Sequence, residues 1–265
     1  MALAVLYLRF VKKSTPEYPK IVIITTARSG SNYLYTLLSS HASIFCEGEI
    51  FNPRQLNKKH HPIVVWLIKK NPLWYILHRI RVAKSKRKPI YGFKLFPAQL
   101  KSNFESLIPK LIQRNFKIIY LVRLNRVSQI LSYLVAEQQD EWVVTANKSK
   151  AENPISLDIN QVARIVAYYK GVWESVDIAK NQYKGLELVY EYDLVSQDMI
   201  STLSQKVSSY LSIPYELLRS KMVKTDTRSD ADRIANLAEV LSEMRRLGLN
   251  DEVDYYLKAQ LNSLS

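Results

Sequence analysis

Short apolar runs alternate along the chain with longer stretches in which apolar residues recur every three or four positions. Runs rich in β-branched residues predict strands at 21–26, 90–95, 117–122 and 186–190. The helical pattern covers 32–40, 98–114, 126–145, 158–181, 196–211 and 229–247. Asp158, Ser196 and Ser229 are expected N-caps, and Gly248 is an expected C-cap. Apolar strands separated by helices predict an α/β fold, in which a mainly parallel central sheet is flanked by helices and binds ligands at the strands' carboxyl ends.

No linker-like stretch and no internal repeat divides the chain, so residues 1–265 are expected to form a single domain. Residues 52–89 interrupt the alternation of strands and helices, and their composition suggests a basic insertion, which we expect to consist of loops. No apolar run is long enough to span a bilayer. The first apolar segment carries its positive charge after the run, opposite to a secretory signal. With Cys46 as the single cysteine, these patterns predict a cytoplasmic protein.

The net charge of +14 is concentrated in one segment, since no Asp or Glu occurs between Glu49 and Glu105 while thirteen Lys and Arg do. Such a field attracts a nucleotide, an acidic glycan, a nucleic acid or a membrane headgroup. A solvated basic face without a specific ligand is the simpler alternative. Trp66, Trp74 and Tyr75 alternate with apolar residues there, which favours core positions. Their lysine neighbours would also suit peripheral contact with an anionic membrane.

A glycine lies between the first predicted strand and the next helix, in the sequence TARSGSN at residues 26–32. Backbone N–H groups of residues 29–32 at a helix start would form an anion-binding nest, and Arg28 would add a forked cation. The loop lacks the first glycine and the lysine of G-x-x-x-x-G-K-[ST], which disfavours a magnesium-dependent kinase. An ordinary tight turn before a helix is the alternative interpretation.

This loop resembles the phosphosulfate loop of sulfotransferases that use 3′-phosphoadenosine 5′-phosphosulfate (PAPS), which reads [KR]-S-G-[ST] between a strand and a helix. The string TTARSGSNYLYTLL, followed by SIFCEGEIFNP, is similar to the bacterial branch that sulfates trehalose and Nod-factor glycolipids. The resemblance implies a P-loop-like fold and a metal-independent transfer of the sulfuryl group from PAPS to a carbohydrate or glycolipid hydroxyl. It implies donor contacts from Arg28, Ser29, Gly30, Ser31, Asn32 and Tyr33, the last at the position of an aromatic that packs on the adenine.

The resemblance also covers the site for the donor's 3′-phosphate. Family members use an Arg that ends a strand and a Ser about eight residues later. Arg123 and Ser132 match this pattern, although nine residues separate them, and Ser128 or Arg126 could take the serine's role.

Three further stretches, 91–95, 189–194 and 233–236, extend the resemblance over most of the chain. In the second, Tyr190 matches a family tyrosine near the adenine, although Tyr192 interrupts the usual Tyr-Glu-Asp-Leu. Lys224 and Arg228 are positioned to close over the 3′-phosphate, but the family's Arg-Lys-Gly is absent.

Removal of the acceptor's proton requires a base. No histidine stands in the sequence context of the family's catalytic histidine, and the resemblance assigns the base to Glu49, with Glu47 as the rival. Arg28 and Lys94 are the candidate cations for charge that develops on the leaving group. His60-His61 has no acidic or cysteine partner at ligand spacing, so a surface pair is expected rather than a metal site.

Two other function classes fit parts of the sequence. A pI near 9.6 and the basic segment suit a polyanion-binding module, but no nucleic-acid-binding motif occurs and nucleic acid is not an expected partner. A nucleotide kinase, or an inactive nucleotide-binding protein, would also account for the loop. The segments expected to select the acceptor, 52–89 and 140–160, leave a sugar, a glycolipid and a small alcohol open.

Overall fold

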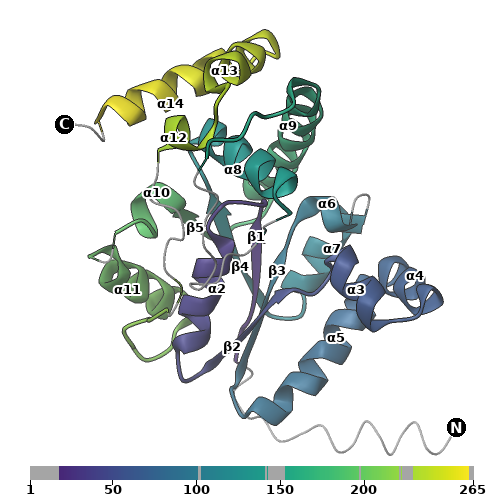
Figure 1. The fold of residues 1–265 in the computed structure, drawn as a ribbon. Helices are drawn as coiled ribbons and strands as arrows, with labels where there is room; N and C mark the ends of the chain where they lie inside the picture. The colour runs from purple at the N-terminus through teal and green to yellow at the C-terminus, as the bar shows by residue number, and fades with distance from the viewer. Residues whose placement is uncertain are drawn as a thin grey trace, which may run out of the picture.

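The computed structural model describes residues 18–262, apart from 101–102, 141, 143–152, 197, 221 and 223–228. In this part of the chain, five parallel strands form one sheet in the order β2-β3-β1-β4-β5 (Figure 1). The strands are β1 Lys20–Thr25, β2 Ile44–Glu49, β3 Ile90–Leu95, β4 Phe116–Val122 and β5 Leu186–Val189. The predicted α/β fold with a parallel central sheet is confirmed.

Helices cover both faces of the sheet (Figure 1). One face carries α2 Ser31–Ser40, α10 Tyr190–Asp193 and α11 Met199–Leu211, and the other carries α3 Pro53–Lys59, α4 Pro62–Lys70, α5 Pro72–Ala83, α6 Pro97–Leu100 and α7 Asn103–Ile112. In β1, Ile21 and Ile23 pack towards α2, while Val22 and Ile24 pack towards α5 and α7. Burial on both faces explains why this strand is a continuous apolar run.

A third core cluster lies beyond the carboxyl ends of the strands (Figure 1). It is formed mainly by α8 Arg126–Gln138, α9 Ile159–Gln182, α13 Leu237–Arg246 and α14 Asn250–Asn262, with α12 Asp230–Arg233 beside them. Tyr169 of α9 and Tyr256 of α14 are almost fully buried in it. Side chains of α8 and α9 from this part of the fold contact the loop that follows β1. Among the described residues, no helix is both long and apolar enough to cross a bilayer.

Residues 52–89 do not form the expected loops, because the segment folds into α3, α4 and α5 and a short 3-10 turn. Each helix begins with a proline, where the missing N–H costs nothing and the fixed φ suits the first turn. The preceding residues Asn52, His61 and Asn71 each accept a backbone N–H from the helix they precede. The three Asn-Pro or His-Pro pairs were therefore the sequence signal for the starts of these helices.

Helix ends follow the expected caps in three of four cases. Asp158 caps α9, Ser229 forms a capping box with α12, and Gly248 (φ 78°) ends α13 in a Schellman motif. Ser196 is not the N-cap of α11, because this helix begins at Met199. The hydroxyl of Ser196 instead accepts the backbone N–H of Asp198.

Several predicted boundaries differ from the structure. The helix expected at 126–145 ends at Gln138, and Asp140 has a φ of 50°. The helix expected at 98–114 is divided into α6 and α7. The helix expected at 229–247 is interrupted between α12 and α13, where Ile234 pairs with Ile155 as an isolated bridge. Besides α3, α4 and α5, the elements that were not predicted are α10, α14, and β2, whose apolar run is interrupted by Glu47, Gly48 and a register shift.

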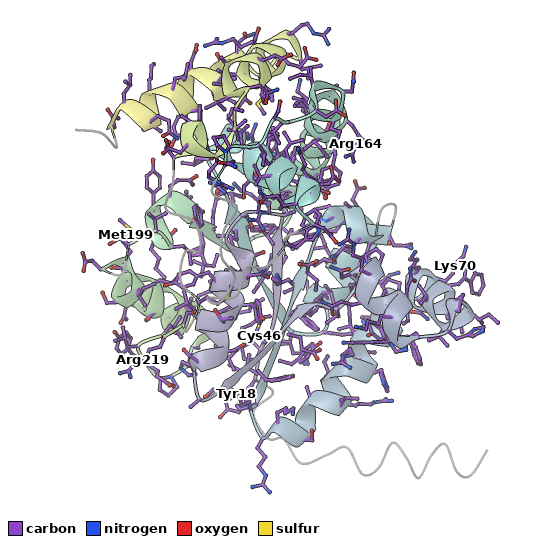
Figure 2. All side chains as sticks on the ribbon, viewed as in Figure 1. Tyr18, Cys46, Lys70, Arg164, Met199 and Arg219 are labelled. Atoms are coloured by element: carbon purple, nitrogen blue, oxygen red, sulfur yellow. The ribbon has the colours of Figure 1, made fainter. Side chains whose placement is uncertain are left out.

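Cys46 of β2 provides a test of the packing, because it is the chain's one cysteine and is buried in the interior (Figure 2). Burial raises the pKa of its thiol to about 12. At pH 8 the reactive thiolate would be on the order of 10⁻⁴ of the total, against about a quarter for a free cysteine. We expect iodoacetamide to label Cys46 at least about 100-fold more slowly in the native protein than in urea. Equal rates, measured by intact mass, would show that β2 is not packed as described.

Candidate active site

The loop between β1 and α2 lies at the centre of the sheet's carboxyl edge. Its backbone turns sharply, with φ of 58° at Arg28 and 80° at Gly30. Gly30 is the N-cap of α2, and no described side chain caps this helix. The first N–H groups of a helix lack intrahelical partners and favour an anion. The loop therefore has the backbone form expected of the predicted nest.

The loop carbonyls of Thr26, Ala27 and Arg28 accept hydrogen bonds from side chains of the protein. The Ser29 hydroxyl donates to the Thr26 carbonyl at 2.8 Å, and Arg123 Nη1 donates to the Arg28 carbonyl at 2.9 Å. The fully buried Ser29 hydroxyl also lies 2.6 Å from Thr25 Oγ1. Ser29 therefore shapes the loop through its side chain, and only its backbone is available to a ligand.

Gln129 of α8 also supports the loop, and the sequence reasoning missed it. Its Nε2 donates to Thr26 Oγ1 and to the Ala27 carbonyl, both at 2.6 Å, while its Oε1 accepts the Trp173 indole N–H at 3.0 Å. The hydroxyl of Tyr169 donates to the same Ala27 carbonyl at 3.1 Å. Gln129 is fully buried, so its amide must have internal hydrogen-bond partners, but its burial is visible only in the structure.

The two parts of the predicted phosphate site lie together. Arg28 Nε donates to Ser132 Oγ at 2.9 Å, and Arg123 reaches the loop through its bond to the Arg28 carbonyl. Arg28 is mostly buried; burial lowers the pKa of its guanidinium, and the neighbouring Arg123 and Arg233 lower it further. Two guanidinium groups and a hydroxyl at one place favour a bound dianion.

The alternatives to Ser132 are less well placed. Arg126 is directed to acids elsewhere, with its guanidinium 3.7 Å from Asp177 and 3.4 Å from Glu252. Ser128 lies in the first turn of α8, where its backbone N–H donates to the Asn125 side chain. Of the three candidates, Ser132 is the one whose side chain contacts Arg28.

Tyr190, at the start of α10, packs on the loop. A methyl group at Gly30 would lie 2.4 Å from Tyr190 Cδ2, and the Arg123 guanidinium lies 4.9 Å from the Tyr190 ring centroid. Tyr192, which interrupts the usual Tyr-Glu-Asp-Leu, is 61% exposed. Its side chain therefore points to solvent, and Tyr190 keeps its contact with the loop. The carboxylate of Glu191 accepts the backbone N–H of Leu124 and of Asn125, which joins α10 to the end of β4.

Substitution of Gly30 by alanine is expected to damage the loop in two ways. The positive φ costs an L-residue about 1–2 kcal/mol, and the added methyl group collides with Tyr190. We expect Gly30→Ala to lower the free energy of unfolding by about 2 kcal/mol in urea. Gly171→Ala in α9, where the methyl group meets open space, should be neutral or stabilising. Tyr190→Ala added to Gly30→Ala should recover the steric part of the loss, and no recovery would contradict the contact.

Glu49, at the end of β2, stands opposite Lys94 of β3 in the sheet register. Lys94 Nζ lies 3.4 Å from Glu49 Oε1 and donates to Asn32 Oδ1 of α2 at 2.5 Å. The other carboxylate oxygen of Glu49 accepts from Asn52 at 2.9 Å and from Gln99 at 3.0 Å. Burial lowers the pKa of Lys94, and the nearby Glu49 opposes that shift. The three predicted residues Glu49, Lys94 and Asn32 therefore form one hydrogen-bonded group.

Glu47 has a different environment. Its carboxylate is paired with Arg79 of α5 and accepts the Tyr91 hydroxyl at 2.6 Å. These contacts join β2, β3 and α5 on the face away from α2. Glu47 therefore forms an ion pair that joins elements of the fold, whereas Glu49 is linked through Lys94 to Asn32 in the first turn of α2.

The remaining predicted donor contacts fall into two groups. Ser31, Asn32 and Tyr33 form the first turn of α2; Tyr33 is half-buried, and burial, followed by the neighbouring Tyr190, raises its pKa. Lys224 and Arg228 lie outside the described residues.

Comparison with known proteins identifies the family of the chain. The model of the sulfotransferase domain family matches residues 18–247, which include β1, its loop, Arg123 and Tyr190. Among solved structures, the chain is similar to a sulfotransferase from Alicyclobacillus acidocaldarius, with 13% identity and a TM-score of 0.43 over 86% of this chain and 95% of that chain. A search of curated proteins finds no significant match. Because the family model covers most of the chain, this protein belongs to the sulfotransferase domain family.

Proposed function

We propose that the protein transfers a sulfuryl group from PAPS to a hydroxyl of a carbohydrate or glycolipid acceptor. The observation that carries the proposal is the junction of Arg28, Ser132 and Arg123 at the open N-terminus of α2. It joins two places suited to anions, the loop amides and the arginine cluster. A nucleotide with phosphate on both its 5′ and 3′ positions needs both.

The residues present fit such a donor. Arg123 Nε is buried and has no hydrogen-bond partner among the described residues, although Glu191 lies 3.8 Å away. An unsatisfied buried N–H beside a cationic cluster is a donor position for a bound oxyanion. Tyr190 packs on Gly30 of the loop and Tyr33 lies in the first turn of α2, and aromatic rings of this kind would stack on the donor's adenine. When bound, PAPS would supply an activated sulfuryl group.

In the proposed reaction, the acceptor oxygen forms a bond to sulfur as the bond from sulfur to the 5′-phosphate oxygen breaks. The acceptor's proton passes to the Glu49 carboxylate, which Asn52, Gln99 and Lys94 hold in place. The amides of the loop and the cations of Arg28 and Lys94 offset the charge that collects on the leaving phosphate. Because Lys94 is buried, its charge acts through a low dielectric.

The acceptor class rests on the similarity of TTARSGSNYLYTLL and SIFCEGEIFNP to enzymes that sulfate trehalose and Nod-factor glycolipids. Incubation with ³⁵S-labelled PAPS and a panel of trehalose, a chitin oligosaccharide, a glycolipid and a simple phenol tests it. We expect label in a carbohydrate-bearing product, undiminished by EDTA. Label in the phenol alone would contradict the acceptor class, and loss of transfer in EDTA would contradict a metal-independent reaction.

A further inference from the structure

Helix α4 has apolar residues on two opposite faces. Val65 and Ile68 are buried against the rest of the fold. At about 100° per residue, Ile63, Trp66 and Leu67 lie on the opposite side of the helix. Their side chains are 63%, 57% and 47% exposed. The expectation that Trp66 is a core residue is therefore wrong, as it is for Trp74, which is 53% exposed; Tyr75 is buried as expected.

The sequence on both sides of the outward face of α4 is rich in lysine and has no acidic residue. Lys58 and Lys59 end α3, and Lys69 and Lys70 end α4; all four are exposed. Lys70 Nζ lies 5.8 Å from the Trp66 ring centroid, so charge and aromatic surface are adjacent. Lysines at helix ends complement the helix dipole, but that effect does not account for the exposed tryptophan and leucine beside them.

The surface formed by residues 58–74, named here the α4 tip, projects from the body of the molecule. Figure 1 shows α4 at the outer edge, away from the sheet, and Figure 2 shows Lys70 at the same edge. Beside it, a hollow of about 370 Å³ lies between the α4–α5 junction and α7. Lys70, Lys110 and Arg114 are among its lining residues. Lys70, whose ammonium lies beside Trp66, therefore also lines a basic hollow large enough for a phosphate group.

We propose that the α4 tip docks on an anionic lipid bilayer. Exposed tryptophan, leucine and isoleucine would enter the region between headgroups and acyl chains, while the lysines contact lipid phosphates. A nucleic acid would use the cations but offers no apolar phase for Ile63 and Leu67. A charged bilayer satisfies both kinds of surface at once. The proposal does not depend on the sulfuryl-transfer reaction.

Vesicle sedimentation tests this proposal with the full chain. We expect binding to phosphatidylcholine vesicles that contain about a third phosphatidylglycerol, and weak binding to phosphatidylcholine alone. Trp66→Ala/Leu67→Ala and Lys69→Gln/Lys70→Gln should each lower the affinity about tenfold or more. The matched controls are Tyr215→Ala/Leu217→Ala, which removes an equally exposed apolar pair, and Lys184→Gln/Lys258→Gln, which removes two exposed charges elsewhere. Both controls should bind as the wild type does.

Tryptophan fluorescence gives an independent readout. Vesicle binding should shift the emission to the blue, and Trp66→Phe/Trp74→Phe should remove most of the shift while vesicle binding persists. Equal losses in the control variants would overturn the proposal. So would binding to duplex DNA or heparin without vesicle binding, or self-association that depends on Trp66 and Leu67 without vesicle binding.

Discussion

Arg123→Ala is expected to lower the affinity for 3′-phosphoadenosine 5′-phosphate, the product nucleotide, by about 100-fold, which corresponds to about 2.7 kcal/mol. The guanidinium lies beside Arg28 and Tyr190, and its loss removes charge-assisted hydrogen bonds to the 3′-phosphate. The affinity for 5′-AMP, which lacks that phosphate, should change by less than about threefold. Isothermal titration of both nucleotides with both proteins gives the comparison.

Two controls separate this role from support of the loop, since Arg123 also bonds the Arg28 carbonyl. Ser132→Ala removes one hydroxyl that contacts Arg28. It should lower the affinity for the product nucleotide about tenfold and leave the affinity for 5′-AMP unchanged. Urea unfolding of each variant reports any loss of fold. An equal loss of affinity for both nucleotides in Arg123→Ala would show that the residue shapes the loop rather than reading the 3′-phosphate.

Glu49→Gln is the second substitution with a large expected effect. The glutamine keeps the size and much of the hydrogen bonding to Asn52 and Gln99 but cannot take a proton. We expect kcat to fall by about 10²–10⁴-fold. The affinity for the product nucleotide should stay within about threefold, because the carboxylate serves the acceptor. Steady-state transfer and calorimetry measure the two quantities.

Glu47→Gln is the matched control, because it removes a carboxylate from the same strand. Glu47 is held by Arg79 and Tyr91, so the change should lower the free energy of unfolding by about 1–3 kcal/mol and leave kcat within a few fold. If Glu47→Gln abolished transfer while Glu49→Gln did not, the assignment of the base would be reversed.

The central part of the fold was predictable because its signals are local. Strand β1 is buried on both faces, so its run of β-branched residues has no other stable placement. The loop that follows has a positive φ at Gly30, which favours glycine at that position and marks the turn. Arg123, Ser132 and Tyr190 came from the family resemblance, and the structure brings them to one loop.

Other features depend on contacts between distant segments, which a single sequence does not show. Strand β2 carries two glutamates, and each is paired with a residue from another element, Glu47 with Arg79 and Glu49 with Lys94. Gln129 becomes a support for the loop only when α8 packs beneath it. The role of Trp66 was misjudged because apolar spacing alone does not tell which of two apolar faces meets the core.

The most direct test of the proposed function is isothermal titration of the wild-type protein with 3′-phosphoadenosine 5′-phosphate, 5′-AMP and ATP. The arrangement of Arg28, Arg123 and Ser132 predicts micromolar binding of the first nucleotide and at least about 100-fold weaker binding of the other two, because neither carries a 3′-phosphate. Equal binding of all three nucleotides, or binding of none, would contradict a PAPS-dependent sulfotransferase.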